Sequence, residues 1–393
     1  MGEAVLIRGA RVATSSAQTA GINLWTGNGR VSFSPVPSSR HLTLDLDGSL
    51  VLPGLINAHD HLELNLLPKL GCGPYPNASA WARDIYHPDE PPIKQHLTVP
   101  KPLRLQWGGI KNLLSGVTTV AHHNAFHPAF LDPSFPVRVV KRYGWAHSLH
   151  FSPDWETRLQ NTPADYPFVI HAAEGVDEAA RGEIQILDKT GALNRPIVLV
   201  HGVGVGRSDL PLLKRRTVGI VWCPTSNLFT LGRSLDTTIL NSAIPIALGT
   251  DSAITADGDL LDELRIAHRT VDAHRLYKMV TSEPARIFKL PAGFGQICDG
   301  GPADFLVMND SGQTPAMTLL ENDPQLVMIR GRVQLISSEI ARRCPLSMLQ
   351  SLQPIELEGR GRYLVSSDVS HLLDETKRAL QPPVRLAGKA VGA

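Results

Sequence analysis

Short apolar runs that turn polar at their carboxyl ends recur through the middle of the chain, and this pattern constrains the fold more than any other feature. The runs lie at 116–123, 166–175, 195–204, 217–227 and 244–253. They are rich in β-branched residues, as are parallel strands that are buried on both faces. Stretches with helical character, such as "GVDEAARGEIQILDKTG", separate them. Strand alternating with helix over roughly 240 residues predicts an α/β fold, the (β/α)8 or TIM barrel.

The stretch 124–165 departs from this alternation because it is rich in proline and aromatic residues. It must supply two strands, and it leaves little room for helices between them. We therefore expect the barrel to be distorted there.

The two ends of the chain have a different texture from the middle. Residues 1–51 contain short, roughly alternating apolar segments punctuated by Gly, Asn and Asp, and similar segments return at 291–340. Such segments are typical of short strands in a small β-sheet. We expect these two parts to form one small β-domain beside a barrel domain of residues 52–290, with 341–393 as a C-terminal extension.

Composition and charge narrow the range of functions. The 393 residues carry 38 basic and 37 acidic side chains, whereas nucleic-acid and membrane-surface binding usually need a basic excess. No stretch reaches the ~18 to 20 uninterrupted apolar residues of a membrane span. Four cysteines without paired spacing predict reduced thiols in a cytoplasmic protein. We expect a small-molecule substrate and no nucleic-acid or membrane partner, and a homo-oligomer of two or more chains is left open.

The polar residues at the strand ends are of the types that bind metal ions. The sequence "VLPGLINAHDHLELN" ends an apolar run in His59 and His61, which alternation places on the same side of a strand. His171, His201 and Asp251 end three later runs. Because the carboxyl ends of all strands meet at one face of a parallel barrel, these residues are expected to converge. Imidazole and carboxylate ligands with an open position suit Zn²⁺ or Fe²⁺.

Each of these features alone has an ordinary structural explanation. A single His at a strand end is more often a hydrogen-bonded structural residue, and Asp251 can serve as the cap of the helix that follows. Four such features, each at the end of a separate buried strand and in the same polarity, argue together for a metal site.

The motifs around these residues resemble the amidohydrolase superfamily, and within it the cytosine deaminase, guanine deaminase and chlorohydrolase-like branch. The resemblance covers nearly the whole chain. Its motifs, in strand order, are "LPGLINAHDHL", "GVTTV", "HAAEG", "VHG", "CPTSN" and "GTDS", and "GGPADFLVMN" follows where the chain returns to the family's β-sandwich. The resemblance implies a distorted (β/α)8 barrel with a small β-sandwich domain formed by the N- and C-terminal segments.

The resemblance also implies roles for individual residues. His59, His61, His171 and Asp251 would hold one divalent metal ion with a water molecule, with Zn²⁺ as the first choice and Fe²⁺ as the alternative. Such a metal lowers the pKa of its water toward neutrality, and Asp251 would accept the proton as the water attacks. Glu174, three residues after His171, would be the general acid that passes a proton to the ring nitrogen and then to the leaving group.

Further residues near the strand ends are candidates for catalysis or substrate binding. His201 would hydrogen-bond the attacking water or the developing oxyanion, and direct ligation of the metal is its alternative role. Ser226 and Asn227 of "CPTSN" are candidates for substrate contacts, although turn chemistry explains them equally well. His122 and His123 follow the second strand and are candidates for the pocket wall, with a polar strand terminus as the simpler reading.

These features predict a metal-dependent hydrolase acting on C–N bonds, in first place a hydrolytic deaminase of a purine, pyrimidine, pterin or triazine-like ring. A binuclear cyclic-amide hydrolase is the alternative, in which a carboxylated Lys141 bridges two metals. Lys141 lies 30 residues before His171, which lies 30 before His201. Against this alternative, Arg138 and Arg142 flank Lys141, as on an exposed strand edge. A non-catalytic oligomeric scaffold is least favoured, because none of the strand-end ligand types is missing.

Overall fold

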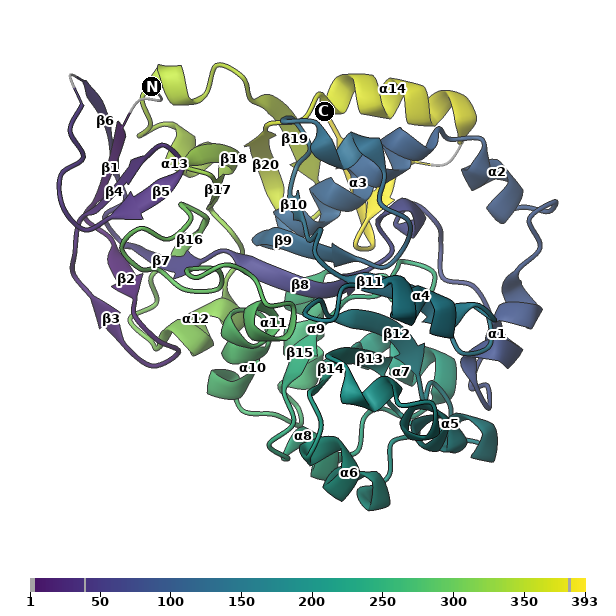
Figure 1. The fold of residues 1–393 in the computed structure, drawn as a ribbon. Coiled ribbons are helices and arrows are strands. Elements are labelled where there is room, and N and C mark those ends of the chain that lie inside the picture. Colours follow the sequence, from purple (N-terminus) through teal and green to yellow (C-terminus); the bar gives the residue numbers. More distant parts are fainter. Residues whose placement is uncertain (1–3, 39, 381–382) are drawn as a thin grey trace.

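The computed structural model describes residues 4–38, 40–380 and 383–393. It places a barrel-like set of parallel strands with surrounding helices beside a β-rich part that contains strands from both ends of the chain (Figure 1). The predicted TIM-barrel-like α/β fold is confirmed at this level.

Eight short parallel strands, β8 to β15, form the barrel-like part. They fall into two sheets, with the strand orders β10-β9-β8 and β11-β12-β13-β14-β15. Their bounds are β8 (Leu55–Asp60), β9 (Val117–His122), β10 (Arg138–Val139), β11 (Gly144–Ser148), β12 (Phe168–Ala172), β13 (Ile197–His201), β14 (Val218–Trp222) and β15 (Ile246–Leu248). The sheets meet just beyond β15, where the N–H groups of Thr250 and Asp251 donate to the His59 carbonyl at 3.0 and 3.1 Å.

On its other side, the barrel-like part is joined by one extended segment that passes between the two sheets. β10 pairs with β9, and β11 pairs with β12. Only residues 140–143 separate β10 from β11, whereas a crossover between neighbouring parallel strands needs a dozen residues or more. The segment therefore passes from pairing with β9 to pairing with β12 without an intervening helix.

Helices cover the outside of these strands. The buried faces of the helices pack against the strands. The bounds are α1 (Ala78–Ile85), α2 (Ile93–Leu97), α3 (Lys101–Leu114), α4 (Trp155–Asn161), α5 (Glu178–Lys189), α6 (Leu210–Lys214), α7 (Pro224–Leu231), α8 (Thr237–Leu240), α9 (Leu260–Ala267), α10 (Ala273–Met279) and α11 (Ser282–Ile287), with 3-10 turns at η1 (Leu62–Leu64), η2 (Pro128–Leu131), η3 (Ala192–Asn194) and η4 (Arg207–Asp209). In α5, the Asp177 side chain caps the first turn, and Ala180, Ile184 and Leu187 form one buried stripe. Within the described residues, none of the helices has the length and apolar character that a membrane span requires.

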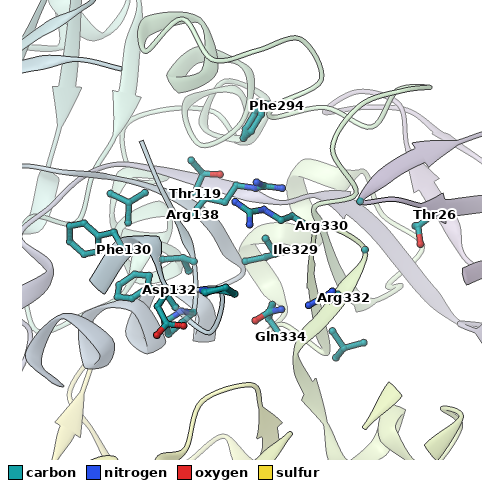
Figure 2. A pocket seen from close by; sticks show the side chains of 18 of the residues that line it. Thr26, Thr119, Phe130, Asp132, Arg138, Phe294, Ile329, Arg330, Arg332 and Gln334 are labelled. Carbon is teal, nitrogen blue, oxygen red and sulfur yellow. The ribbon is translucent and has the colours of Figure 1, made fainter. Parts of the chain in front are cut away.

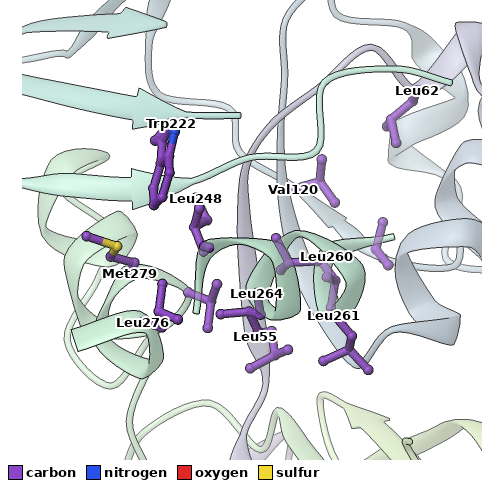
Figure 3. Packing of buried hydrophobic residues seen from close by; sticks show 14 of the residues in the cluster. Leu55, Leu62, Val120, Trp222, Leu248, Leu260, Leu261, Leu264, Leu276 and Met279 are labelled. Carbon is purple, nitrogen blue, oxygen red and sulfur yellow. The ribbon is translucent and has the colours of Figure 1, made fainter. Parts of the chain in front are cut away.

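The largest apolar core lies between the strands and these helices. Figure 3 shows Leu260, Leu261 and Leu264 of α9 beside Leu248 of β15 and Leu55 of β8. All five side chains are completely buried. This packing fixes the position of the loop from β15 to α9, and that loop carries Asp251.

The β-rich part consists of a four-stranded and a ten-stranded sheet around a second apolar cluster. The four-stranded sheet has the order β5-β4-β1-β6, and the ten-stranded sheet has the order β21-β22-β19-β20-β18-β17-β16-β7-β2-β3. The bounds are β1 (Ala4–Arg8), β2 (Arg11–Ala13), β3 (Thr19–Ala20), β4 (Leu24–Gly27), β5 (Arg30–Ser32), β6 (His41–Asp45), β7 (Ser49–Pro53), β16 (Phe305–Asn309), β17 (Leu326–Ile329), β18 (Arg332–Ser337), β19 (Gln353–Leu357), β20 (Gly361–Val365), β21 (Arg385–Leu386) and β22 (Lys389–Gly392), with α12 (Pro315–Glu321), α13 (Ser338–Ala341), η5 (Leu346–Met348) and α14 (Val369–Ala379). β7 pairs antiparallel with β16, so the two ends of the chain meet in one sheet.

The last fifty residues pack against the barrel through buried polar contacts. α14 lies over α3 (Figure 1), and the Trp107 indole N–H donates to the Thr376 hydroxyl at 2.8 Å. Arg360, in the turn between β19 and β20, forms a 2.9 Å ion pair with Asp259, and both side chains are buried. Asp259 also caps α9 through the N–H groups of Leu261 and Asp262. The C-terminal segment therefore supports the start of the helix that follows the Asp251 loop.

We expect Arg360→Met to destabilise the fold strongly, because it leaves the Asp259 carboxylate buried without its cation. Loss of one partner of a buried ion pair typically costs about 3–5 kcal/mol. The same substitution at the exposed Arg362 is the matched control and should stay within about 0.5 kcal/mol. The free energy of unfolding, measured by urea titration of both variants, tests this prediction. Equal values for the two variants would show that the pair contributes nothing to stability.

Candidate metal centre

The end of β8 is fixed from behind by a buried polar network. The Asp60 carboxylate points away from the histidines that flank it and accepts hydrogen bonds from four side chains. The longest comes from the Asn57 amide at 3.4 Å, and the other three are shorter. These come from the Asn65 amide at 2.7 Å, the Asn112 amide at 2.8 Å and the Thr250 hydroxyl at 3.0 Å. Gly249 lies against His59, where an added Cβ would come within 2.7 Å of the His59 Cβ. The backbone that presents His59 is therefore held on both sides.

Four of the predicted ligands converge at the carboxyl ends of the strands. The Nε2 atoms of His59 and His61 each lie 3.7 Å from Asp251 Oδ1. His171 Nε2 lies 3.2 Å from His59 Nε2. His201 joins the same cluster, with its Nε2 3.9 Å from Asp251 Oδ2. Two overlapping groups, His59–His61–Asp251 and His59–His171–His201, have the spacing that a metal ion needs.

The hydrogen bonds around His59 and His171 determine which ring nitrogens carry protons. His171 Nδ1 lies 2.6 Å from the His147 carbonyl, and His123 Nε2 lies 2.9 Å from the Ala146 carbonyl. A carbonyl only accepts, so both of these nitrogens carry a hydrogen. His123 Nδ1 then accepts from His59 Nδ1 at 3.2 Å. Consequently the Nε2 atoms of His59 and His171 both present lone pairs, which face each other at 3.2 Å.

Two opposed lone pairs at this distance repel each other, and a cation between them removes the repulsion. Burial lowers the pKa of His59 and of His171, and it lowers the pKa of His61 to about 3, so the three imidazoles are neutral at pH 7. Although burial opposes ionisation of Asp251, the histidines beside it bring its pKa well below the usual value. Three neutral imidazoles and one carboxylate are a ligand set for a divalent metal ion, so the residues fit such a cofactor.

Glu174 lies beside this cluster and is suited to proton transfer. Its Oε1 is 3.5 Å from His201 Nε2, and His201 Nδ1 is 2.8 Å from the Asn227 side-chain oxygen. Burial raises the pKa of Glu174 to about 7, with His201 opposing the shift and Asp251 adding to it. A carboxyl group with a pKa near the working pH both donates and accepts protons readily.

Backbone strain is concentrated at these strand ends. Ala173, His201 and Asp251 have φ values of 53°, 72° and 55°, a region that L-residues seldom occupy. The Ala173 N–H donates to Glu183 Oε2 at 2.6 Å, which helps to hold the strained turn before Glu174. Strained residues of this kind cluster at functional sites, where the surrounding structure enforces them.

The predicted substrate residues of the "CPTSN" motif contact the cluster itself. The Ser226 hydroxyl donates to Asp251 Oδ2 at 2.7 Å, and Thr255 donates to the same oxygen at 3.0 Å. Asn227 binds His201. Both predicted residues are buried. In this structure they orient Asp251 and His201.

The two histidines after β9 lie in different surroundings. His123 binds His59 and stacks on His171, with ring centroids 4.4 Å apart. His122 Nδ1 instead accepts the Leu62 N–H, and its Nε2 lies 3.5 Å from the buried Glu63 carboxylate. Of these two histidines, His123 is the one that directly contacts the cluster of candidate metal ligands.

His147, at the end of β11, is a site residue that the sequence analysis missed. Its ring centroid lies 4.8 Å from that of His171, and its Nδ1 is buried without a hydrogen-bond partner among the described residues. Burial lowers its pKa to about 4. The available signal was a further histidine closing a short apolar run, "WAHS", in a stretch where no regular strand was apparent. An unpartnered imidazole nitrogen beside the cluster is free to bind a ligand.

Lys141 lies away from the cluster. It is exposed in the link between β10 and β11, and its ammonium lies over the Phe126 ring, 5.7 Å from the centroid. This position does not favour a bridging role between two metals.

Comparisons with known proteins agree with this geometry. The model of the Amidohydrolase family matches residues 156–334. This span includes His171, Glu174, His201 and Asp251, and the remaining cluster residues precede it. Over this span the chain is similar to the amidohydrolase family.

Curated relatives and solved structures extend the similarity over most of the chain. The 5-methylthioadenosine/S-adenosylhomocysteine deaminase of Pyrococcus furiosus is 24% identical over 348 residues, covering 68% of this chain and 77% of the relative. The deaminase of the same name from Teredinibacter turnerae is 25% identical, covering 72% and 78%. A zinc-bound adenosine deaminase from Xanthomonas campestris superposes with a TM-score of 0.71 at 18% identity, covering 95% and 97%. A triazine hydrolase variant gives 0.72 at 19% identity, covering 96% and 99%.

We expect His123→Phe to weaken metal binding although it adds no charge and keeps a ring beside His171. The substitution removes the acceptor that holds His59 Nδ1–H, so His59 loses its fixed tautomer. Loss of such an outer hydrogen bond typically lowers metal affinity about 10- to 100-fold. Competition with a chelating dye measures the affinity, and His150→Phe, at an exposed histidine, is the control. An unchanged affinity in His123→Phe would remove His123 from the support of the site.

Proposed function

We propose that this protein is a metal-dependent hydrolytic deaminase that releases ammonia from an aminated heterocycle. The observation that carries the proposal is the pair of opposed lone pairs on His59 and His171, with Asp251 and Glu174 beside them. A divalent metal bound there would supply a water molecule that ionises near neutral pH.

The residues around this position have complementary proton-transfer roles. Asp251 is the more acidic carboxyl group and remains ionised, and Ser226 and Thr255 hold its Oδ2. Its carboxylate is the acceptor for the proton of the attacking water. Glu174, whose pKa is raised to about 7, carries a proton to the ring nitrogen of the substrate and then to the departing amine. His201 Nδ1–H donates to the Asn227 side-chain oxygen, so its Nε2 presents a lone pair that accepts a hydrogen bond from the attacking water.

The names of the curated relatives indicate which aminated ring to test first. They act on 5-methylthioadenosine and S-adenosylhomocysteine by name, and one solved neighbour is an adenosine deaminase. We propose a purine nucleoside as the substrate class, with an aminated triazine as the second choice because of the triazine hydrolase neighbour. Ser226, Asn227, His122 and His123 stay candidates for substrate contacts.

Finer features of the chain belong to the same proposal. We propose one Zn²⁺ per chain, held by His59, His61, His171 and Asp251, with Fe²⁺ as the alternative.

The architecture belongs to the same proposal. The two parallel sheets would form one distorted barrel over 52–290. The two sheets of the β-rich part would form a β-sandwich built from 1–51 and 291–340, with 341–393 as an extension. The shared apolar cluster between those two sheets supports the sandwich. Unpaired cysteines support a cytoplasmic location, and a homo-oligomer of two or more chains stays open.

The metal-to-chain ratio separates this function from the binuclear cyclic-amide hydrolase. Protein purified without chelators should hold about one metal ion per chain and release ammonia from adenosine, 5-methylthioadenosine or S-adenosylhomocysteine. Removal of the metal should abolish the release, and Zn²⁺ should restore it. Lys141→Ala is the matched control and should leave both values unchanged. A ratio near two that falls with Lys141→Ala would favour the binuclear alternative.

We expect Glu174→Gln and His201→Asn to retain the metal and to lose most of the turnover. Neither side chain belongs to the proposed ligand set, whereas both contribute to proton transfer or to orienting the attacking water. Loss of a general acid typically lowers kcat about 10²- to 10⁴-fold. Elemental analysis and steady-state kinetics on the same preparations test both parts. Metal-free protein for either variant would make that residue a ligand, and turnover near that of the unaltered enzyme would exclude it from the mechanism.

A further inference from the structure

A cleft with a strongly basic wall lies between the barrel-like part and the β-rich part. Its volume is about 1290 Å³, and none of the residues of the metal cluster lines it. One wall is the segment around β10, and another is the hairpin of β17 and β18 (Figure 2). The cleft borders the place where the chain passes from β10 to β11 without a covering helix.

Positive charge dominates the cleft wall. Six basic residues line it, namely Arg138, Lys141, Arg142, Lys289, Arg330 and Arg332. Among the described residues Asp132 is the one acidic residue that lines it. The whole chain has a formal charge of only +1, so this excess is a local feature. A cleft lined by charges of one sign concentrates ligands of the opposite sign.

The arginines of the cleft are only partly neutralised. Arg138 uses its Nε and one Nη to bind Asp304 at 2.7 and 3.0 Å. Asp304 Oδ1 also accepts the backbone N–H of Arg330 at 2.8 Å. This carboxylate is therefore occupied, and among the described residues no carboxylate lies within ion-pair distance of the Arg330 or Arg332 guanidinium groups. Burial lowers the pKa of Arg330, and the nearby positive charges of Arg138 and Arg332 lower it further.

The backbone at Arg330 is held in a conformation that an arginine seldom adopts. Arg330 and Gly331 form the two-residue turn between β17 and β18, with φ values of 55° and 71°. Asparagine and glycine are the usual residues at such a position, because an L-residue with a longer side chain is strained there. The turn is nevertheless fixed by Asp304 and by the Gly331 N–H, which donates to the Ala303 carbonyl at 2.8 Å. Figure 2 shows the Arg330 guanidinium directed toward that of Arg138.

We propose that this cleft binds a small molecule bearing a doubly charged oxyanion, a phosphate or a dicarboxylate, between the side chains of Arg138, Arg330 and Arg332. The planar guanidinium group pairs with two oxygens of such an anion at once. The cleft is larger than a bare anion requires, so it also has room for the body of the ligand. The site is separate from the metal cluster and does not depend on the proposed deaminase activity.

Isothermal titration calorimetry on the full-length, metal-loaded protein tests this site, with inorganic phosphate and succinate as probes. Sodium chloride at matched ionic strength serves as the blank. We expect saturable binding of at least one probe at one site per chain. Phosphate alone binding would identify a phosphorylated ligand, and succinate alone a dicarboxylate. Binding of neither probe would overturn the proposal.

Arginine variants locate the bound anion. Arg330→Asn removes the guanidinium and favours the same turn, so the fold should be retained, which the melting temperature checks. It and Arg332→Gln should each weaken binding about tenfold or more. Arg362→Gln, at an exposed arginine on β20, is the matched control and should bind as the unaltered protein does.

Two outcomes would refute the site. Binding that survives both cleft variants would place the anion elsewhere, at the metal for example. A change of sedimentation coefficient in Arg330→Asn would likewise refute it, because the cleft would then be a contact between chains.

Discussion

The candidate metal centre is organised around two imidazole nitrogens that face each other without a proton between them. His59 Nε2 and His171 Nε2 are 3.2 Å apart, and both lone pairs are fixed because the other nitrogen of each ring donates a hydrogen bond. Burial prevents either ring from becoming protonated at neutral pH. An arrangement of this kind is unfavourable until a cation enters it. The polar network behind Asp60 and the packing of β15 against β8 resist the separation that would relieve the repulsion.

The same constraint explains why the strained residues are where they are. His201 and Asp251 can point at the shared centre only if the chain turns sharply at the end of each strand, and both have positive φ values. The α9 core and the Arg360–Asp259 ion pair hold the Asp251 loop, while Glu183 holds the turn before Glu174. The strain is maintained by packing that extends to the last residues of the chain. The C-terminal segment thus contributes to the site although it contains none of the predicted ligands.

Sequence periodicity predicts the parts of this protein whose structure is determined locally. The apolar runs that end in His171, His201 and Asp251 have one strong pattern each, so their strands and common polarity follow directly. Partners set by tertiary contacts leave no such pattern. The motif makes Ser226 and Asn227 candidates for substrate contacts or for turn chemistry, and it does not indicate that their side chains bind Asp251 and His201. His147 was missed because β11 lies in the stretch rich in proline and aromatic residues, where the local sequence shows no regular strand. Its neighbourhood is created by the fold rather than by the local sequence.

The short link between β10 and β11 lies next to both the histidine cluster and the basic cleft. Four residues cannot form a crossover, so a single extended segment completes the pairing of β9 and then of β12. As a result β11 delivers His147 beside His171, and the Tyr143 hydroxyl donates to the His122 carbonyl. On the outer side, the segment without a helix leaves β10 as a wall of the basic cleft, with Arg138 at its start. A regular strand–helix unit at this point would bring a covering helix to the wall that the cleft now occupies. The short link between β10 and β11 therefore places His147 beside the candidate metal ligands and leaves β10 to line the candidate anion site.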